Sequence, residues 1–553
     1  MTFSRCISCA IASAIVLSCC SCSDMNDYTS RSSRITDSET EYTTVQPVDE
    51  SKDSSDADGT GYEMLEAVSA DVEQLINDLA KPHNKDTVQS DIDKLLDMFD
   101  IIYEKRTFAS VDFYSDYQNS EAKAAFQSTE HLFSIAEALI SYGFFCGTES
   151  QYNDLFKDIT PPEAAALYGG GDYDLETARA EAESAYLDDE ENMNRYYDIV
   201  DDDTLSMDEK DLRCAEILID MLADETPESF YDDYYRDYTG DEIFALRETV
   251  TSNIIPAYFD LRDKYLDTWP LTRYAHEELS ETPFDVIQKY AGSLSPDIRE
   301  SADRLVNEKL FKICSSEKAF DISFMDDLPA QNSAYIFIGQ QSDEDIFSAA
   351  VHEFGHFHAS FYDDTHAFLM KDNFDIAETQ SQGMEILFTQ FYDDIYGDNG
   401  RMNGDHMRLS TLSDICYCVF SAFCIGSFEY ELVSRINDIT SEEVVRLFNS
   451  ACDDSPVGYH LSDIAHLYEC PGYYISYATS ALASLELFFD LAEDKDRAIE
   501  KYEKMAEISC YSGEYTFREA LDICGFEDVI TEKFITDISK KLSDYALNVK
   551  AHL

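Results

Sequence analysis

The sequence has few basic residues, and this shortage excludes a large class of partners. It contains 40 Lys and Arg against 112 Asp and Glu, which gives a formal net charge of −72 at pH 7. Recognition of phosphate needs clustered basic side chains and a positive field, so we expect no nucleic-acid partner. Anionic lipid surfaces also repel such a chain, so any membrane attachment needs another device.

Glycine and proline are scarce as well, with 20 and 12 residues in a chain of 553. This is about half of their ~12% share in an average protein. All-β folds need many turns, so the shortage disfavours them and favours long helices. Hydrophobic residues make up 44% of the chain and include 34 Phe and 36 Tyr, so we expect a large folded core.

The N-terminus has the pattern of an export signal. Arg5 supplies a positive charge, and the apolar residues 7–17 are fewer than the ~20 that span a bilayer. Val16-Leu-Ser-Cys19 resembles a bacterial lipoprotein signal, in which the cysteine becomes the lipidated first residue. Cys20 and Cys22 are other possible anchor positions, and an ordinary secretory signal is the alternative interpretation. We therefore expect a mature protein outside the cytoplasmic membrane, lipid-anchored at the cell surface or secreted.

Composition and periodicity divide the chain into four segments. Residues 1–22 are the signal, and residues 23–60, rich in Ser, Thr and Asp, form a solvated tether. Residues 61–265 have helical periodicity, and residues 266–553 are also helical apart from one expected strand at 334–339. The fold class we expect is mainly α, with a small β element.

Two local patterns refine the second half of the chain. Ser342-Asp-Glu-Asp345 is a capping box, which predicts the start of a helix. The apolar stretch 407–436 contains acidic residues, so we expect a buried core helix there and no membrane span. Of the ten cysteines beyond the signal, none form a CxxC pair, and we expect most to be buried small side chains.

The capped helix contains the motif Val351-His-Glu-Phe-Gly-His356. His352 and His356 are four residues apart, so both imidazoles point to one side of the helix and can bind one Zn²⁺. Glu353 lies on the adjacent flank, where its carboxylate can reach a water molecule at the metal. These three residues predict the core of a hydrolytic zinc site.

A catalytic zinc site takes three protein ligands and leaves a fourth position open. The best third ligand is Glu378, which follows His356 after enough chain for a loop and a return helix. Gln382 and Glu385 share its helix face, so we expect them to orient the ligands. The sequence also offers two rival ligands, His358 and His366.

Residues 466–477 combine one histidine with several tyrosines around a Pro-Gly turn. Tyrosine hydroxyls can donate hydrogen bonds to a developing oxyanion, and such a loop can cover a site. A chain with 36 Tyr buries many of them for packing alone, so this cluster on its own is a weak signal.

Together these segments resemble the zinc metallopeptidases of the thimet oligopeptidase and oligoendopeptidase F family, and they are most similar to the latter. The HEFGH motif matches the zinc helix of that family, and residues 377–385 match its third-ligand helix, with Glu378 at the ligand position. Residues 336–347 resemble the strand and loop before the zinc helix, and residues 466–479 resemble the segment with the transition-state residues. One departure is Ala359, where the family usually has a histidine.

The resemblance implies a helical peptidase with a deep channel, one Zn²⁺ per chain and short peptides as substrates. It assigns the oxyanion donors to His466, Tyr473 and Tyr477, with Tyr474 as an alternative. It also implies that residues 61–265 wall the channel and that the strand 334–339 holds an extended peptide through backbone hydrogen bonds.

We therefore expect a zinc-dependent endopeptidase that hydrolyses short unstructured oligopeptides. The alternative is a non-catalytic, peptide-binding surface lipoprotein on a degenerate metallopeptidase fold. Glu353 separates the two, because a protein that only binds peptides needs no base beside two ligands. We expect the acidic surface to serve solubility, in preference to the selection of basic peptides.

Overall fold

The computed structural model describes residues 57–549 apart from short gaps at 170–172, 203, 224, 228–230, 232–233, 273–281, 317, 321, 340–345, 398–400, 454 and 456–457. The expected signal and anchor cysteines, most of the expected tether, and the capping box at 342–345 lie outside the described residues. The division of the chain into a wall region and a catalytic region stays a prediction.

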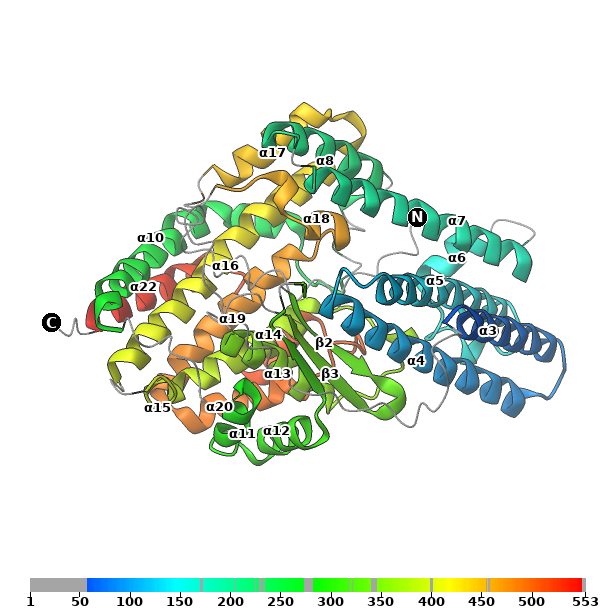
Figure 1. The fold of residues 1–553 in the computed structure, drawn as a ribbon, viewed down its shortest axis with the longest axis horizontal. Helices are drawn as coiled ribbons and strands as arrows, with labels where there is room; N and C mark the ends of the chain where they lie inside the picture. Colours follow the sequence, from blue (N-terminus) through cyan, green and yellow to red (C-terminus); the bar gives the residue numbers. More distant parts are fainter. Residues whose placement is uncertain are drawn as a thin grey trace.

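The protein is mainly α-helical, as the shortage of glycine and proline predicts, with one small sheet near its centre (Figure 1). The first part of the chain forms helices that extend away from this sheet. They are α3 (Ala57–Leu79), α4 (Lys85–Ser115), α5 (Ser120–Thr148), α6 (Pro162–Tyr168), α7 (Leu175–Val200) and α8 (Met207–Met221). Helices α3, α4 and α5 pack together around their own apolar core, which contains Leu75, Phe99 and Ile135.

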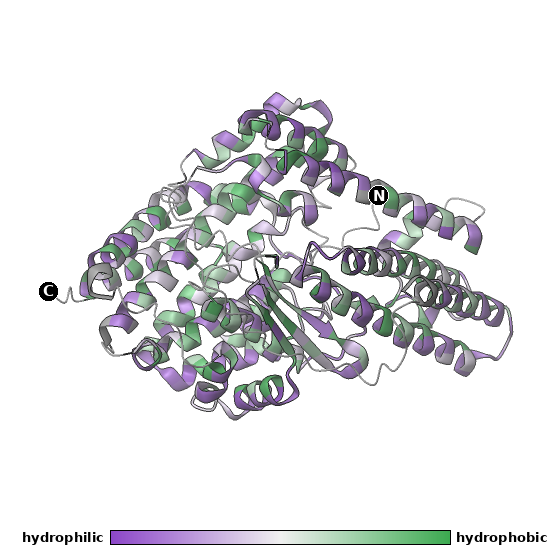
Figure 2. Ribbon diagram, viewed as in Figure 1, coloured by the Kyte–Doolittle hydropathy of each residue, from purple (hydrophilic) through white to green (hydrophobic). Residues whose placement is uncertain are grey.

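The rest of the chain surrounds the sheet and forms a second, larger core. Its helices are α10 (Gly240–Thr272), α11 (Pro283–Ala291), α12 (Pro296–Glu308), α13 (Ile346–Ser360), α14 (Phe374–Phe388), α15 (Tyr392–Ile395), α16 (Arg401–Arg435), α17 (Ser441–Cys452), α18 (His466–Glu469), α19 (Tyr474–Glu493), α20 (Lys495–Ala506), α21 (Phe517–Cys524) and α22 (Glu532–Asn548). Helix α16 packs against α10 and α19. Hydrophobic residues lie mainly towards the centre of the molecule, and hydrophilic residues cover the outer helices (Figure 2).

Helix α16 was expected to be a buried core helix, and it is. It is long and apolar enough to cross a membrane, but 89% of its apolar window is buried inside the fold. Protein atoms therefore cover this surface. The ten cysteines are free thiols, and all are buried except the half-buried Cys146 and Cys314.

The sheet has three strands, whereas the sequence predicts only one. Strands β1 (Phe311–Cys314), β2 (Ile322–Leu328) and β3 (Ser333–Gly339) lie in the order β1-β3-β2. β3 is the expected strand; it pairs in parallel with β1 and antiparallel with β2. β1 was missed because it is only four residues long, and β2 because it contains the pair Asp326-Asp327, a residue type that is rare in strands.

The strand order corrects one expectation about the substrate. β3 cannot hold an added peptide strand, because both of its edges are already paired. β2 lies at the edge of this sheet, so it has one row of backbone groups that β3 does not use.

Candidate metal centre

Helices α13 and α14 approach each other very closely at Gly355. A Cβ atom on Gly355 would lie 2.6 Å from the Cα atom of Ser381 and 2.7 Å from the carbonyl oxygen of Gln380. Both are backbone atoms that cannot move without shifting α14, so only glycine fits at this crossing. The glycine inside the HEFGH motif is therefore the signal of this contact, which the sequence analysis did not use.

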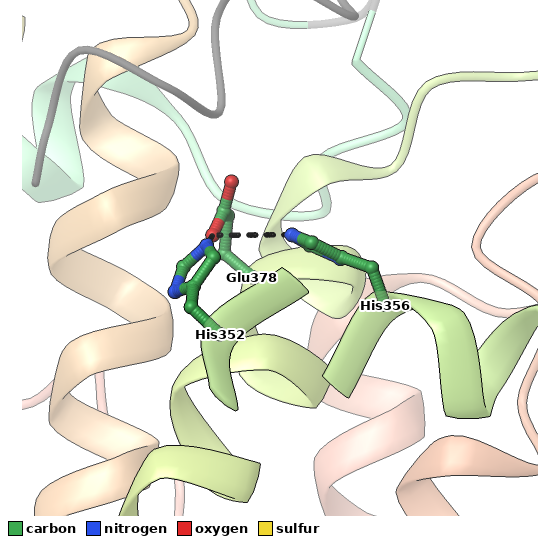
Figure 3. A group of neighbouring side chains, drawn as sticks. All are labelled: His352, His356 and Glu378. Carbon is green, nitrogen blue, oxygen red and sulfur yellow. Dashed lines mark ion pairs between the residues drawn. The ribbon is translucent and has the colours of Figure 1, made fainter. Parts of the chain in front are cut away.

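This crossing brings the three expected zinc ligands together. His352 and His356 extend from α13, Glu378 extends from α14, and one ligand atom of each lies within 4.8 Å of the others. The Oε2 atom of Glu378 is 3.4 Å from Nε2 of His352 and 3.9 Å from Nε2 of His356. Figure 3 shows the two imidazoles and the carboxylate pointing towards one another.

The donor set fits a zinc ion. The Nε2 atoms of His352 and His356 are buried and have no hydrogen-bond partner among the described residues. Two imidazole nitrogens and one carboxylate oxygen are the donor set of a catalytic zinc site. Burying unpartnered polar atoms is costly, and a bound cation would remove that cost.

The two rival histidines lie elsewhere. His358 faces away from the cluster, with Nδ1 2.8 Å from Ser301 Oγ and Nε2 3.4 Å from Glu503. His366 pairs with Asp100 at 2.7 Å. Neither histidine belongs to the cluster of His352, His356 and Glu378.

Neighbouring side chains hold the candidate ligands in place. Glu385 Oε1 lies 2.8 Å from Nδ1 of His352, so Nδ1 carries the proton and Nε2 faces the cluster. Ser381 donates a hydrogen bond of 3.0 Å to Oε2 of Glu378, and Tyr473 donates one to Oε1. The structure thus places Glu385 in the orienting role expected from the sequence. Gln382 makes no hydrogen bond to the cluster within the described chain, and its Oε1 atom is unpartnered.

Glu353 is the most unusual carboxyl group in the site. It is 0% exposed, and neither carboxylate oxygen has a hydrogen-bond partner within the part of the chain that the structure describes. Burial raises its pKa to about 8, against the opposing positive field of His352. Buried carboxyl groups are normally paired, so an unpaired one beside a candidate metal site is typical of a catalytic group.

The histidine and tyrosine cluster packs directly against Glu378. The ring of His466, on α18, stacks on Tyr473 with 5.7 Å between centroids. It also contacts Tyr474 at 5.6 Å and Tyr477 at 6.2 Å. The structure therefore brings all four expected residues together, but the Tyr473 hydroxyl bonds a candidate ligand in place of facing open space.

A buried ion pair, which the sequence analysis missed, connects these segments. Arg236 lies 3.3 Å from Asp375, which is one turn before Glu378 on α14. Arg236 also donates hydrogen bonds of 2.7 Å to the carbonyl oxygen of Gly472 and 2.8 Å to Ser476 Oγ. It therefore links α14 to the turn before α19. The rarity of arginine in this chain was the available signal.

A cavity of about 100 Å³ opens at the cluster. His356, Glu378 and Tyr473 line one side, and Arg106 of α4 and Phe133 of α5 line another. Met325 and Asp326 of β2 also line it, so the edge of the sheet reaches the same space. The N-terminal helices thus contribute part of the wall.

Solved structures with the same fold carry peptidase names, although no protein-family model and no curated protein matches this sequence. A protein from Bacillus anthracis str. Ames with the provisional name oligoendopeptidase F matches with a TM-score of 0.59 and 13% identity, over 89% of this chain and 97% of the other. PZ peptidase A with an inhibitor matches with a TM-score of 0.57 and 13% identity, over 88% and 98%. At such identities the likeness shows the fold.

Proposed function

We propose that this protein is a zinc-dependent endopeptidase that hydrolyses short unstructured oligopeptides. The observation that carries the proposal is Glu353, a buried carboxyl group without a partner among the described residues, next to the cluster of His352, His356 and Glu378. A protein that only binds peptides has no use for such a group. The peptidase names of proteins with this fold support the same function.

One zinc ion per chain would be held by Nε2 of His352, Nε2 of His356 and the carboxylate of Glu378. When bound, zinc supplies Lewis-acid polarisation of the attacking water and the scissile carbonyl. Glu385 keeps His352 in the tautomer that presents Nε2 to the cluster.

The protein groups move the proton and stabilise charge. Glu353 accepts the proton of the attacking water and delivers it to the leaving amine. His466 and Tyr477, with Tyr474 as an alternative, donate to the developing oxyanion. Tyr473 is already engaged with Glu378, so we assign it mainly to positioning that carboxylate.

The substrate would bind in an extended form along β2. This edge strand has free backbone groups, and its Met325 and Asp326 line the cavity at the cluster. A folded protein would first have to unfold, at a cost of about 5–15 kcal/mol. We therefore expect short peptides to be cleaved and folded proteins to resist.

We also propose that the protein works outside the cytoplasmic membrane, anchored through lipid at Cys19. The lipoprotein-like motif at 16–19 supports this location. Metabolic labelling with a fatty acid should mark the wild-type protein, and Cys19→Ala should abolish the label. Label that persists in Cys19→Ala would move the anchor to Cys20 or Cys22.

Metal analysis combined with hydrolysis of a quenched fluorescent peptide tests the activity. The purified protein should contain one zinc per chain and cleave the peptide, and a chelator should stop cleavage until zinc is restored. The double variant His352→Ala, His356→Ala should lose both properties. Full zinc content in the double variant would contradict this site. Zinc and tight peptide binding without cleavage would favour the binding protein.

A further inference from the structure

A second, strongly acidic cavity adjoins the candidate metal centre. It has a volume of about 240 Å³ and is lined by four aspartates and one histidine, and no Lys or Arg is among its described lining residues. The aspartates are Asp100, Asp327, Asp363 and Asp364. Its contents must therefore match a concentration of negative charge.

The two cavities are parts of one continuous cleft. Met370 and Tyr511 line both the acidic cavity and the cavity at the cluster. A narrow space between them is lined by His356 together with Ser360 and Asp363, which connects a candidate zinc ligand to the acidic cavity. A peptide bound at the cluster can therefore reach the acidic cavity with a nearby side chain.

Asp327 is the carboxylate in this cavity that lacks a full set of partners. It is 6% exposed, and its Oδ2 atom has no hydrogen-bond partner in the described part of the chain. Tyr511 is the one hydrogen-bond donor to this carboxylate. Burial, with a smaller contribution from Asp363, raises the pKa of Asp327 to about 7. An incoming cation would offset the cost of burying this group.

Two other aspartates are already satisfied. Asp100 accepts hydrogen bonds from the backbone N–H of Ala367 at 2.8 Å and from His366 at 2.7 Å. Asp363 accepts from the backbone N–H of Thr365 at 2.9 Å and from a serine hydroxyl. They add negative field but offer few free oxygens. A calcium ion needs six to eight oxygen ligands, so this set suits an organic cation better.

We propose that this acidic cavity, with Asp327 at its wall, is a specificity subsite for a cationic side chain, lysine or arginine, of the substrate peptide. The proposal rests on the proposed peptidase function and narrows its substrates to peptides with a basic residue near the cleaved bond. The cavity gives the negative charge of this chain a local role beside that of solubility.

Matched peptides test this subsite. A quenched peptide series should carry Lys, or its neutral analogue norleucine, at one position at a time, each with a free and an acetylated amino terminus. Zinc-loaded wild-type protein should prefer Lys at one position by about tenfold or more in kcat/KM, because a desolvated charge pair there is lost with norleucine. Equal rates for Lys and norleucine at every position would overturn the subsite.

Protein variants locate the preference. Asp327→Asn should bring the ratio of the Lys to the norleucine rate close to one, and the exposed Asp364→Lys should lower it without touching the core. Asp537→Asn, which changes an exposed aspartate on α22, should keep the wild-type ratio. A ratio that survives in both cavity variants would overturn the assignment. The ratio compares two substrates on one protein, so a general loss of activity cancels.

Three further outcomes separate this proposal from its neighbours. A preference that disappears on acetylation would mean that the cavity takes the terminal ammonium group, which overturns the side-chain assignment. A preference that millimolar calcium abolishes would make the cavity a metal site. If no peptide is cleaved, anisotropy titration of the same peptides decides: tighter binding of the Lys peptide supports the subsite without the activity, and equal binding overturns it.

Discussion

The bundle of α3, α4 and α5 and the crossing of α13 and α14 are both well-packed pieces of helix, but they bury opposite kinds of side chain. The bundle core is apolar, with residues such as Leu75, Phe99 and Ile135. The crossing buries imidazoles and carboxyl groups, among them His352 and Glu353. Apolar burial stabilises a fold, whereas unpaired polar burial destabilises it. The contrast shows which region is built for stability and which for chemistry.

The bundle has one instructive exception. Arg106 and Glu130 are both buried and form an ion pair of 2.6 Å, at the end of the bundle that faces the cavity. Here the buried carboxyl group has its counter-ion, unlike Glu353. Two buried glutamates in one protein, one paired and one not, therefore give a direct way to test the contrast.

The largest effect should come from Glu353→Gln. An amide cannot accept the proton of the attacking water, so kcat should fall by about 10²–10⁴-fold. Zinc content should stay at one per chain, and the thermal midpoint should hold or rise because the variant removes an unpaired buried carboxyl group. Peptide kinetics, metal analysis and a melting curve check this. A variant with more than a tenth of wild-type kcat would rule out Glu353 as the base.

Glu130→Gln should have the reverse profile. Removing one partner of a buried ion pair leaves Arg106 uncompensated, at a cost of about 3–5 kcal/mol in the free energy of unfolding. Zinc bound per folded chain should not change, since the pair does not touch the ligands. Denaturant unfolding and metal analysis measure the two quantities. Stability equal to wild type would mean that the pair is not buried as described.

Gly355→Ala should damage the helix crossing itself. The new Cβ atom meets backbone at 2.6 Å, and such overpacking costs about 1–3 kcal/mol. The shift of α14 should also weaken zinc binding, because Glu378 moves with it. The matched control is Gly61→Ala in α3, where the nearest atom is 3.5 Å away and alanine favours the helix. If both variants have wild-type stability and zinc affinity, the close crossing is wrong.

The smallest effects should separate two neighbouring tyrosines. Tyr473→Phe removes a hydrogen bond to Glu378, so zinc affinity should fall by about 10–100-fold. Tyr477→Phe should leave zinc affinity unchanged and lower kcat more than it changes KM, because an oxyanion donor acts in the transition state. Competition with a zinc chelator and steady-state kinetics measure these effects. The opposite pattern would exchange the two roles.

Much of the site could be predicted because its signals are local. The spacing of His352 and His356 places both on one side of a single helix, whatever surrounds that helix. The helical face shared by Glu378 and Glu385 is equally local, and so is the strand character of β3. These expectations agree with the structure for that reason.

The missed features are all long-range. β2 contains Asp326 and Asp327, which propensity disfavours in a strand, and only its pairing with β3 makes it one. The order of the strands then excluded β3 as the acceptor of a peptide strand. Arg236 carries no local sign of its partners, which lie more than a hundred residues further along the chain.

The ligand types, their spacing and the helical character of the chain are therefore properties of the sequence, because each depends on neighbours within a few turns of helix. The meeting of His352 with Glu378, the hydrogen bond from Tyr473 and the burial of Asp327 depend on how distant segments pack. Packing acts through shape, such as the absence of a side chain at Gly355 that lets two helices touch. No local pattern encodes which surfaces will meet, so these features belong to the fold.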